Sequence, residues 1–211
     1  EMGIEEFTKG NDKKIIDNKN KFEFLGVKSP ERREIQKQFY PELQKLSEKE
    51  IINICKELWK LSPREFQHFA LDIIRKYLKN PSKEVLSDLY YFITTKSWWD
   101  TVDGIAPNVV GKFARVFPEQ MKETLHRWES HDSFWIRRAC LIFQLRYRTE
   151  TDLTLLQYFI NRFKPEREFF IQKAIGWSLR EVSKWNPTWV AEVVQAEQLT
   201  GLAKREASKY I

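Results

Sequence analysis

The sequence predicts an all-α fold, a curved solenoid of about six helix pairs that forms a single domain over residues 1–211. The chain has only 7 glycines, about half of what an average composition of roughly 7% would give. It is rich in Glu, Lys, Leu, Arg and Gln, which favour helices. Apolar residues recur at helical spacing and nowhere alternate as in a strand. A motif also repeats about every 35 residues, which is typical of solenoids.

Signals for helix starts follow one another along the chain. The first is Ser29-Pro30, after an N-terminal segment, residues 1–21, that we expect to be partly irregular or trimmed. The stretches Ser47–Glu50 and Ser62–Glu65 have the spacing of a capping box. In that motif the hydroxyl accepts an amide three residues on and the carboxylate reaches back. Ser97–Asp100 predicts another start, with Asp in place of Glu.

Signals for helix ends alternate with these starts. Proline cannot continue a helix, so it marks a stop. Such stops occur at Asn80-Pro81, Phe117-Pro118, Lys164-Pro165 and Asn186-Pro187. The segments between starts and stops, about 10 to 18 residues long, carry their apolar residues at helical spacing.

The repeated motif is an aromatic residue four positions before an alanine, which places both on one helix face. It occurs as Phe66/Ala70, Trp135/Ala139 and Phe170/Ala174, and Trp99/Asp103 fits the same frame. We call residues 70, 103, 139, 174 and 207 the anchor positions; they are separated by 33, 36, 35 and 33 residues. We expect the alanines to allow close packing of adjacent repeats.

Asp103 breaks this pattern, because it occupies a position that other repeats fill with alanine. A position that departs from a consistent pattern is a functional candidate. Pro107, one turn later, predicts a bend or interruption of the helix at a cost of about 3 kcal/mol. Trp98 points about 100° away from Trp99 and is expected in the core. The structural alternative for Asp103 is a buried ion pair with an arginine of the neighbouring repeat.

Two further residues stand close to anchor positions. Arg138 directly precedes Ala139, and its alternative is a solvated helix charge. Trp177 follows Ala174 by three positions, where other repeats carry Ile73 and Ile142, so its alternative is an ordinary core residue.

The net charge of +6 and pI of about 9.2 favour an anionic partner, nucleic acid before a membrane surface. Basic residues recur near the starts or along the second helix of each predicted pair, where a concave surface could follow a phosphate backbone. Scattered solubilising charge is the alternative. These residues are Lys28, Arg33, Lys96, Arg137, Arg138, Arg146, Arg148, Lys173, Arg180 and Lys184.

Several classes of site are not indicated. With three histidines and no paired cysteines, neither a zinc site nor a Ser/His/Asp arrangement is expected. No glycine-rich phosphate loop occurs, and no apolar run is long enough to span a membrane. Cys55 and Cys140 are expected to be buried free thiols, which suggests a reducing compartment and a cytoplasmic protein.

From about Phe22 to Ala207 the chain resembles the AlkD-type alkylpurine DNA glycosylases, bacterial repair proteins built from HEAT-like helical repeats. The resemblance rests on FLG with SPERR, TKSWWDTVD, Arg138-Ala139 with IFQL, IQKAIGW with LRE, and KREA. It implies hydrolysis of the N-glycosidic bond of N3-alkyladenine and N7-alkylguanine in double-stranded DNA. It also implies a monomer without metal or cofactor that leaves the damaged base stacked.

The resemblance also implies roles for single residues. The catalytic aspartate of the family falls on Asp103, its sugar-facing tryptophans on Trp99 and Trp177, and its backbone-contacting arginine on Arg138. Lys28-Ser29 occupies the lesion-proximal loop, where Gln-Thr is familiar in the family.

The residue types suit this chemistry. A cationic purine leaves without a strong acid, and positive charge then develops on the sugar. A carboxylate about 4 Å away stabilises that charge by about 4 kcal/mol at an effective dielectric near 20, or roughly a thousandfold in rate. The alternatives are a non-catalytic helical-repeat scaffold that binds nucleic acid or an acidic protein, and an RNA-binding repeat protein.

Overall fold

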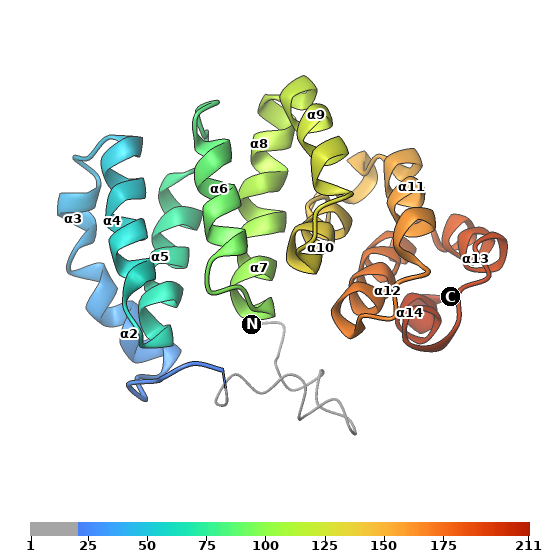
Figure 1. The fold of residues 1–211 in the computed structure, drawn as a ribbon, viewed down its shortest axis with the longest axis horizontal. Helices are drawn as coiled ribbons and strands as arrows, with labels where there is room; N and C mark the ends of the chain where they lie inside the picture. Colours follow the sequence, from blue (N-terminus) through green and yellow to red (C-terminus); the bar gives the residue numbers. More distant parts are fainter. Residues whose placement is uncertain (1–20) are drawn as a thin grey trace. The chain divides into compact units, whose positions relative to one another are not determined.

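The computed structural model describes residues 21–211, which contain helices and no strand, as the sequence predicts (Figure 1). The predicted irregular segment, residues 1–21, lies outside the described residues except for Lys21. The chain divides into two compact units, and the boundary along the sequence falls between Asp72 and Ile73.

The first unit contains the helices α2 (Ser29–Lys37), α3 (Tyr40–Leu43), α4 (Glu48–Lys60) and the beginning of α5 (Arg64–Tyr77). The predicted capping box at the start of α4 is confirmed: the Ser47 amide donates to the Glu50 carboxylate at 2.8 Å, and the Glu50 amide donates to the Ser47 hydroxyl at 3.4 Å. The second predicted box is different. The Glu65 carboxylate instead accepts from the amides of Leu25 and Gly26 at 3.0 and 2.9 Å, so it fastens the segment before α2 to the start of α5.

The second unit is built of successive helix pairs. The first helices of the pairs are α6 (Val85–Thr94), α9 (Pro118–Trp128), α11 (Leu153–Phe163) and α13 (Pro187–Ala196). The second helices are α7 (Trp99–Ile105) continuing into α8 (Gly111–Val116), then α10 (Phe134–Ile142), α12 (Phe169–Ser183) and α14 (Gly201–Ala207). Short 3-10 turns cover Arg148–Glu150 and Ser208–Tyr210. The second helices contact one another in chain order, α7 with α10, α10 with α12 and α12 with α14. This unit is therefore a helical solenoid.

The anchor alanines are packing residues, as the repeat predicts. Ala139, Ala174 and Ala207 lie on α10, α12 and α14 and are completely buried, and Ala70 is completely buried in α5 of the first unit. Asp103 lies on α7, which is likewise the second helix of its pair. The frame read from the sequence thus identifies the second helix of each pair.

The predicted interruption at Pro107 is confirmed and takes the form of a π-helical turn. This turn, Ala106–Val110, joins α7 to α8. Proline has no amide to donate, and the amide of Gly111 donates five residues back to Ala106. The side-chain amide of Asn108 donates to the Gly104 carbonyl at 2.8 Å, which helps to satisfy a backbone acceptor beside the irregular turn.

Two glycines permit close contacts between repeats. A Cβ atom on Gly111 would lie 2.4 Å from the carbonyl oxygen of Phe143, and one on Gly176 would lie 2.4 Å from the Cβ of Glu206. Any side chain at these positions would push α8 away from the end of α10, or α12 away from α14.

Cys55 and Cys140 are free and buried, as predicted. Burial raises the pKa of Cys55 to about 12 and also raises the pKa of Cys140. Within residues 21–211, no helix combines the length and apolar character that a membrane span requires.

Candidate functional site

Asp103 and Arg138 form a two-pronged ion pair between successive second helices. Arg138 donates from Nε to Oδ1 of Asp103 at 2.8 Å and from Nη2 to Oδ2 at 2.7 Å, and its Nη1 donates to the Phe170 carbonyl of α12. The Arg138 side chain is 1% exposed and the Asp103 side chain 12% exposed. One guanidinium therefore joins α7, α10 and α12, and the carboxylate keeps a small exposed edge.

Burial raises the pKa of the Asp103 carboxyl, and the positive charge and hydrogen bonds of Arg138 oppose this shift. A guanidinium stays protonated in proteins, and each of its two prongs here needs an acceptor oxygen. The geometry therefore fits an ionised carboxylate whose orientation Arg138 fixes.

Arg138 is the residue for which the family resemblance implies a contact with the DNA backbone. Its guanidinium is turned toward Asp103 and Phe170, away from solvent. The ion pair weighed as the structural alternative for Asp103 is thus present, and it involves the same two residues as the expected catalytic pair.

An aromatic cluster lies beside this pair. Trp98 is buried, as predicted, with ring centroids 5.5 Å from Trp135 and 5.2 Å from Phe170. Trp135 and Phe170 are 4.9 Å apart, and the Arg138 guanidinium carbon lies 5.9 Å from the centroid of Phe170. The repeat motif identifies Trp135 and Phe170 as packing residues, but only the folded chain shows that they pack together, with Phe170 beside Arg138.

Trp99 and Trp177 are both partly exposed. Trp99 is the first residue of α7 and stands one turn before Asp103. Trp177 lies on α12, two turns beyond Phe170 and so on the same helix face. Its indole Nε1 is buried and finds no hydrogen-bond partner among residues 21–211.

The start of α7 differs from the prediction. Ser97 is not the capping residue: Trp98 precedes the first helical residue, and the Ser97 hydroxyl donates to the Ile93 carbonyl at 2.6 Å. The hydroxyl therefore satisfies a backbone carbonyl in the last turn of α6. Lys96, predicted to bind DNA, is partly exposed and has a left-handed backbone with φ of 49°, an uncommon conformation for a residue with a side chain.

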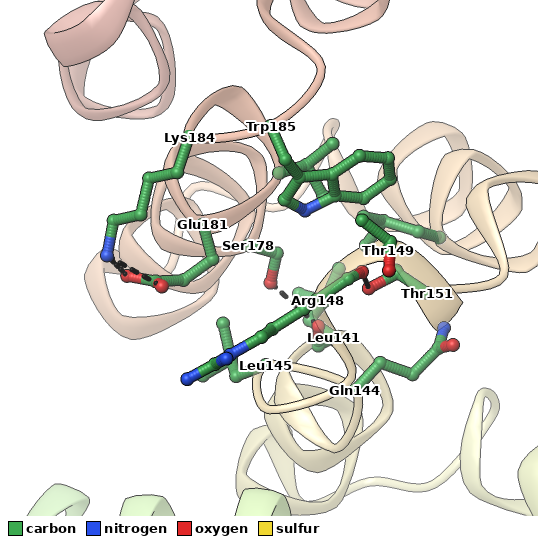
Figure 2. A pocket seen from close by; sticks show the side chains of 12 residues that line it. Leu141, Gln144, Leu145, Arg148, Thr149, Thr151, Ser178, Glu181, Lys184 and Trp185 are labelled. Carbon is green, nitrogen blue, oxygen red and sulfur yellow. Dashed lines mark hydrogen bonds and ion pairs between the residues drawn. The ribbon is translucent and has the colours of Figure 1, made fainter.

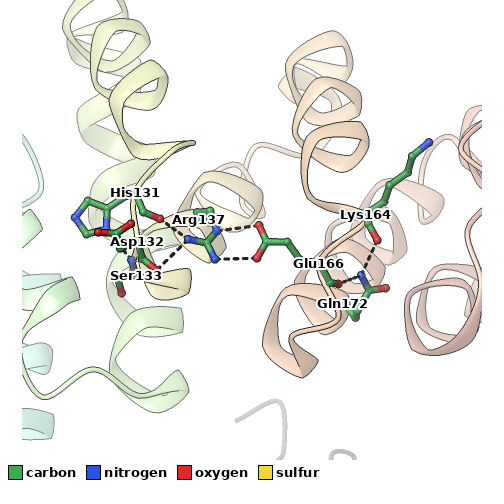
Figure 3. Close-up of polar contacts among 7 residues, drawn as sticks. All are labelled: His131, Asp132, Ser133, Arg137, Lys164, Glu166 and Gln172. Carbon is green, nitrogen blue, oxygen red and sulfur yellow. Dashed lines mark hydrogen bonds and ion pairs between the residues drawn. The ribbon is translucent and has the colours of Figure 1, made fainter.

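Arg137, predicted to bind DNA, also bridges two repeats (Figure 3). Its Nε and Nη2 donate to the Glu166 carboxylate at 2.8 and 2.9 Å, and its Nη1 donates to the carbonyls of His131 and Asp132. With its side chain 19% exposed, the guanidinium is occupied within the protein.

Lys173 and Arg180 converge on one buried carboxylate. Glu206 of α14 accepts from Lys173 at 3.0 Å and from Arg180 at 3.2 Å, and all three side chains are at most 13% exposed. Burial lowers the pKa of Lys173, and Glu206 opposes this shift. These two predicted DNA-binding residues therefore hold α12 to α14.

A pocket of about 570 Å³ lies between the ends of α10 and α12 (Figure 2). Its lining includes the indole of Trp185 together with Arg148 and Lys184. Lys184, a predicted DNA-binding residue, donates to Glu181 at 2.8 Å. Arg146 is exposed and follows Leu145, one of the residues that line this pocket.

The remaining predicted DNA-binding residues belong to the first unit. Lys28 and Ser29 are exposed at the start of α2, where the Lys28 amide donates to Glu31 at 3.2 Å. Arg33 is half exposed, 3.7 Å from Asp72.

Residues 21–211 contain no group of His, Cys, Asp and Glu side chains arranged to hold a metal ion. The site consists of a carboxylate, a guanidinium and indoles. Such a set can stabilise positive charge and orient a water molecule.

Residues 4–211 match the family of DNA alkylation repair enzymes. The chain is 34% identical to the solved structure of a predicted DNA alkylation repair enzyme from Enterococcus faecalis, with a TM-score of 0.84 over 92% of this chain and 90% of that one. No curated protein matches the chain.

Proposed function

The chain belongs to the DNA alkylation repair enzyme family, and we propose that it is a monofunctional DNA glycosylase. Its substrates would be cationic alkylpurines, such as N3-alkyladenine and N7-alkylguanine, in double-stranded DNA. The observation that carries this proposal is the Asp103 carboxylate, which replaces a packing alanine and is held by both oxygens. Close packing alone would be served by alanine, as at the other anchor positions.

In the proposed reaction, the bond between the sugar C1′ and the purine nitrogen breaks and its electron pair leaves with the base. This neutralises the alkylated purine and leaves positive charge on the sugar. A water molecule then adds to C1′ and loses a proton, giving an abasic site and a free base. Asp103 stabilises the positive sugar and orients or deprotonates the water.

The magnitude follows from Coulomb's law. A carboxylate about 4 Å from the sugar contributes about 4 kcal/mol at an effective dielectric near 20, roughly a thousandfold in rate. Arg138 shares the carboxylate, so this value is an upper limit. The guanidinium also holds the carboxylate in one orientation before DNA binds, so no reorientation is needed during the reaction.

We assign the sugar contacts to Trp99 and Trp177, which are both partly exposed. Their ring faces attract cationic and polarised C–H groups by about 1–2 kcal/mol. Because a cationic base leaves readily, the mechanism needs neither metal nor cofactor. The proposal includes a monomer that acts in the cytoplasm and leaves the damaged base stacked, with Lys28 and Ser29 beside the lesion.

The proposal is tested with Asp103→Asn and a matched control, Glu166→Gln. Each variant removes the charge of one carboxylate from a two-pronged arginine pair. Only the first should lower single-turnover release of N7-methylguanine from duplex DNA, by about a hundredfold or more, with little change in DNA affinity.

Full activity of Asp103→Asn would refute the catalytic role and leave a structural ion pair. A wild-type protein that binds nucleic acid tightly but releases no base would favour the scaffold alternative.

A further inference from the structure

A second group of charged side chains lies in the second unit, outside the site described above. We call Lys112, Arg75, Lys79 and Arg146 the Lys112 cluster. Lys112 is in α8, Arg75 near the end of α5, Lys79 just after α5 and Arg146 just after α10. Partial burial lowers the pKa of Lys112, and the positive charges of Lys79, Arg146 and Arg75 lower it further. Lys79, Arg146 and Arg75 are therefore close enough to repel Lys112.

Three members of the cluster lack the carboxylate partners that neutralise other basic residues in the described part of the chain. Lys79, Lys112 and Arg146 each have no ion-pair partner within residues 21–211. By contrast, Arg115, three residues beyond Lys112, lies 2.8 Å from Glu150. Uncompensated like charges disfavour the folded chain, and an anionic ligand would reverse that effect.

Packing between repeats brings Lys112 and Arg146 together. Gly111 lies against the end of α10, where an added Cβ would approach the Phe143 carbonyl to 2.4 Å, and the Tyr147 hydroxyl donates to the Gly111 carbonyl. Lys112 follows Gly111 and Arg146 precedes Tyr147, so this contact positions both cations.

The π-helical turn sets the direction of Lys112. In an uninterrupted helix, a residue nine positions beyond Asp103 would lie about 180° around the axis, on the opposite side. The π turn accommodates one extra residue and rotates Lys112 back by about 100°. The angle between Asp103 and Lys112 around the axis thus falls from about 180° to about 80°. Each has an arginine of the α10 segment near it, Arg138 for Asp103 and Arg146 for Lys112.

We propose that the Lys112 cluster is a phosphate-binding site for the backbone of the same DNA duplex whose damaged nucleotide lies at Asp103. This inference rests on the proposed function. Lys112 lies nine residues beyond Asp103, which is at most about 13.5 Å along the helix axis at 1.5 Å per residue. That distance is well within one turn of duplex DNA, about 34 Å, so one duplex reaches both.

The test measures binding of an unmodified duplex, which requires no catalysis, at several salt concentrations. Lys112→Gln should weaken binding roughly threefold or more, and the slope of log affinity against log salt should become less negative by about 0.9, the effect of one lost phosphate contact. Lys112→Arg should retain both values.

Lys122→Gln is the matched control, because Lys122 is an exposed lysine on α9, the first helix of its pair, with no ion pair within residues 21–211. Lys79→Gln repeats the test outside α8, so that altered helix packing cannot imitate the result. Wild-type affinity and slope in both Lys112→Gln and Lys79→Gln would overturn the proposal, as would equal losses in Lys122→Gln. Absence of base release by the wild type would refute the glycosylase alone and leave these binding results intact.

Discussion

Replacing Arg138 with methionine tests whether the ion pair at the candidate site acts as the structure indicates. The guanidinium is 1% exposed and makes two hydrogen bonds to Asp103 and one to the Phe170 carbonyl. Arg138→Met keeps much of the side-chain volume and leaves a nearly buried carboxylate without its partner. Breaking a buried pair in this way costs about 3–5 kcal/mol.

For a chain of this length, each kcal/mol lowers Tm by about 2–4 °C, so Arg138→Met should melt about 6–20 °C below wild type. The double variant Asp103→Leu/Arg138→Met replaces both charges with apolar groups of similar size. Since such replacements are often neutral or stabilising, the double variant should regain most of the lost Tm. Thermal melting followed by circular dichroism, with urea unfolding as a second measure, provides the comparison.

A decrease of less than about 3 °C in Arg138→Met would refute the buried-pair reasoning. So would a double variant whose loss equals the sum of the two single losses, because the charges would then not be coupled. Arg138→Met, Asp103→Leu and the double variant should all lose base release, so stability distinguishes the structural role of the pair from its proposed catalytic role.

Two further variants test the packing between repeats. Gly176→Ala places a Cβ 2.4 Å from the Cβ of Glu206, so it should destabilise the protein by about 1–3 kcal/mol; an unchanged Tm would contradict the close contact of α12 with α14. Hydrogen bonds from Gln157, and then from Lys164 and a neighbouring amide, hold the pKa of Glu197 below its ordinary value. A lowered pKa stabilises the fold above the ordinary pKa, and this stabilisation is lost as pH falls through the folded value. Glu197→Gln should therefore lower Tm at pH 7, and the difference should shrink below about pH 4; a difference independent of pH would contradict this assignment.

The features predicted correctly depend on local signals. Prolines end or interrupt helices through their own backbone chemistry, and the 35-residue period records packing that every repeat must satisfy. Ser97 was misassigned because a hydroxyl can also donate backward, here to Ile93, and local spacing does not decide between the two partners.

The partners of the basic residues depend on how the repeats stack, which local patterns do not contain. Lys173 and Arg180 have the charge of DNA-binding residues, yet both bond to Glu206 of the next pair. Lys112, which the sequence did not single out, has no ion-pair partner within residues 21–211. Its direction depends on the π-helical turn after Pro107, and the sequence predicts the interruption but not the resulting rotation.

The position of Asp103 has a consequence for how the site is held. Its partner Arg138 lies 35 residues along the chain, one repeat away, and Lys173 meets Glu206 across the next interface at a separation of 33 residues. Arg138 also bonds to α12 through the Phe170 carbonyl, so the two ion pairs connect the second helices α7, α10, α12 and α14 in series. The carboxylate is thus oriented by the stacking of repeats rather than by a loop. A substitution that separates these helices should alter the site even where it touches none of its residues.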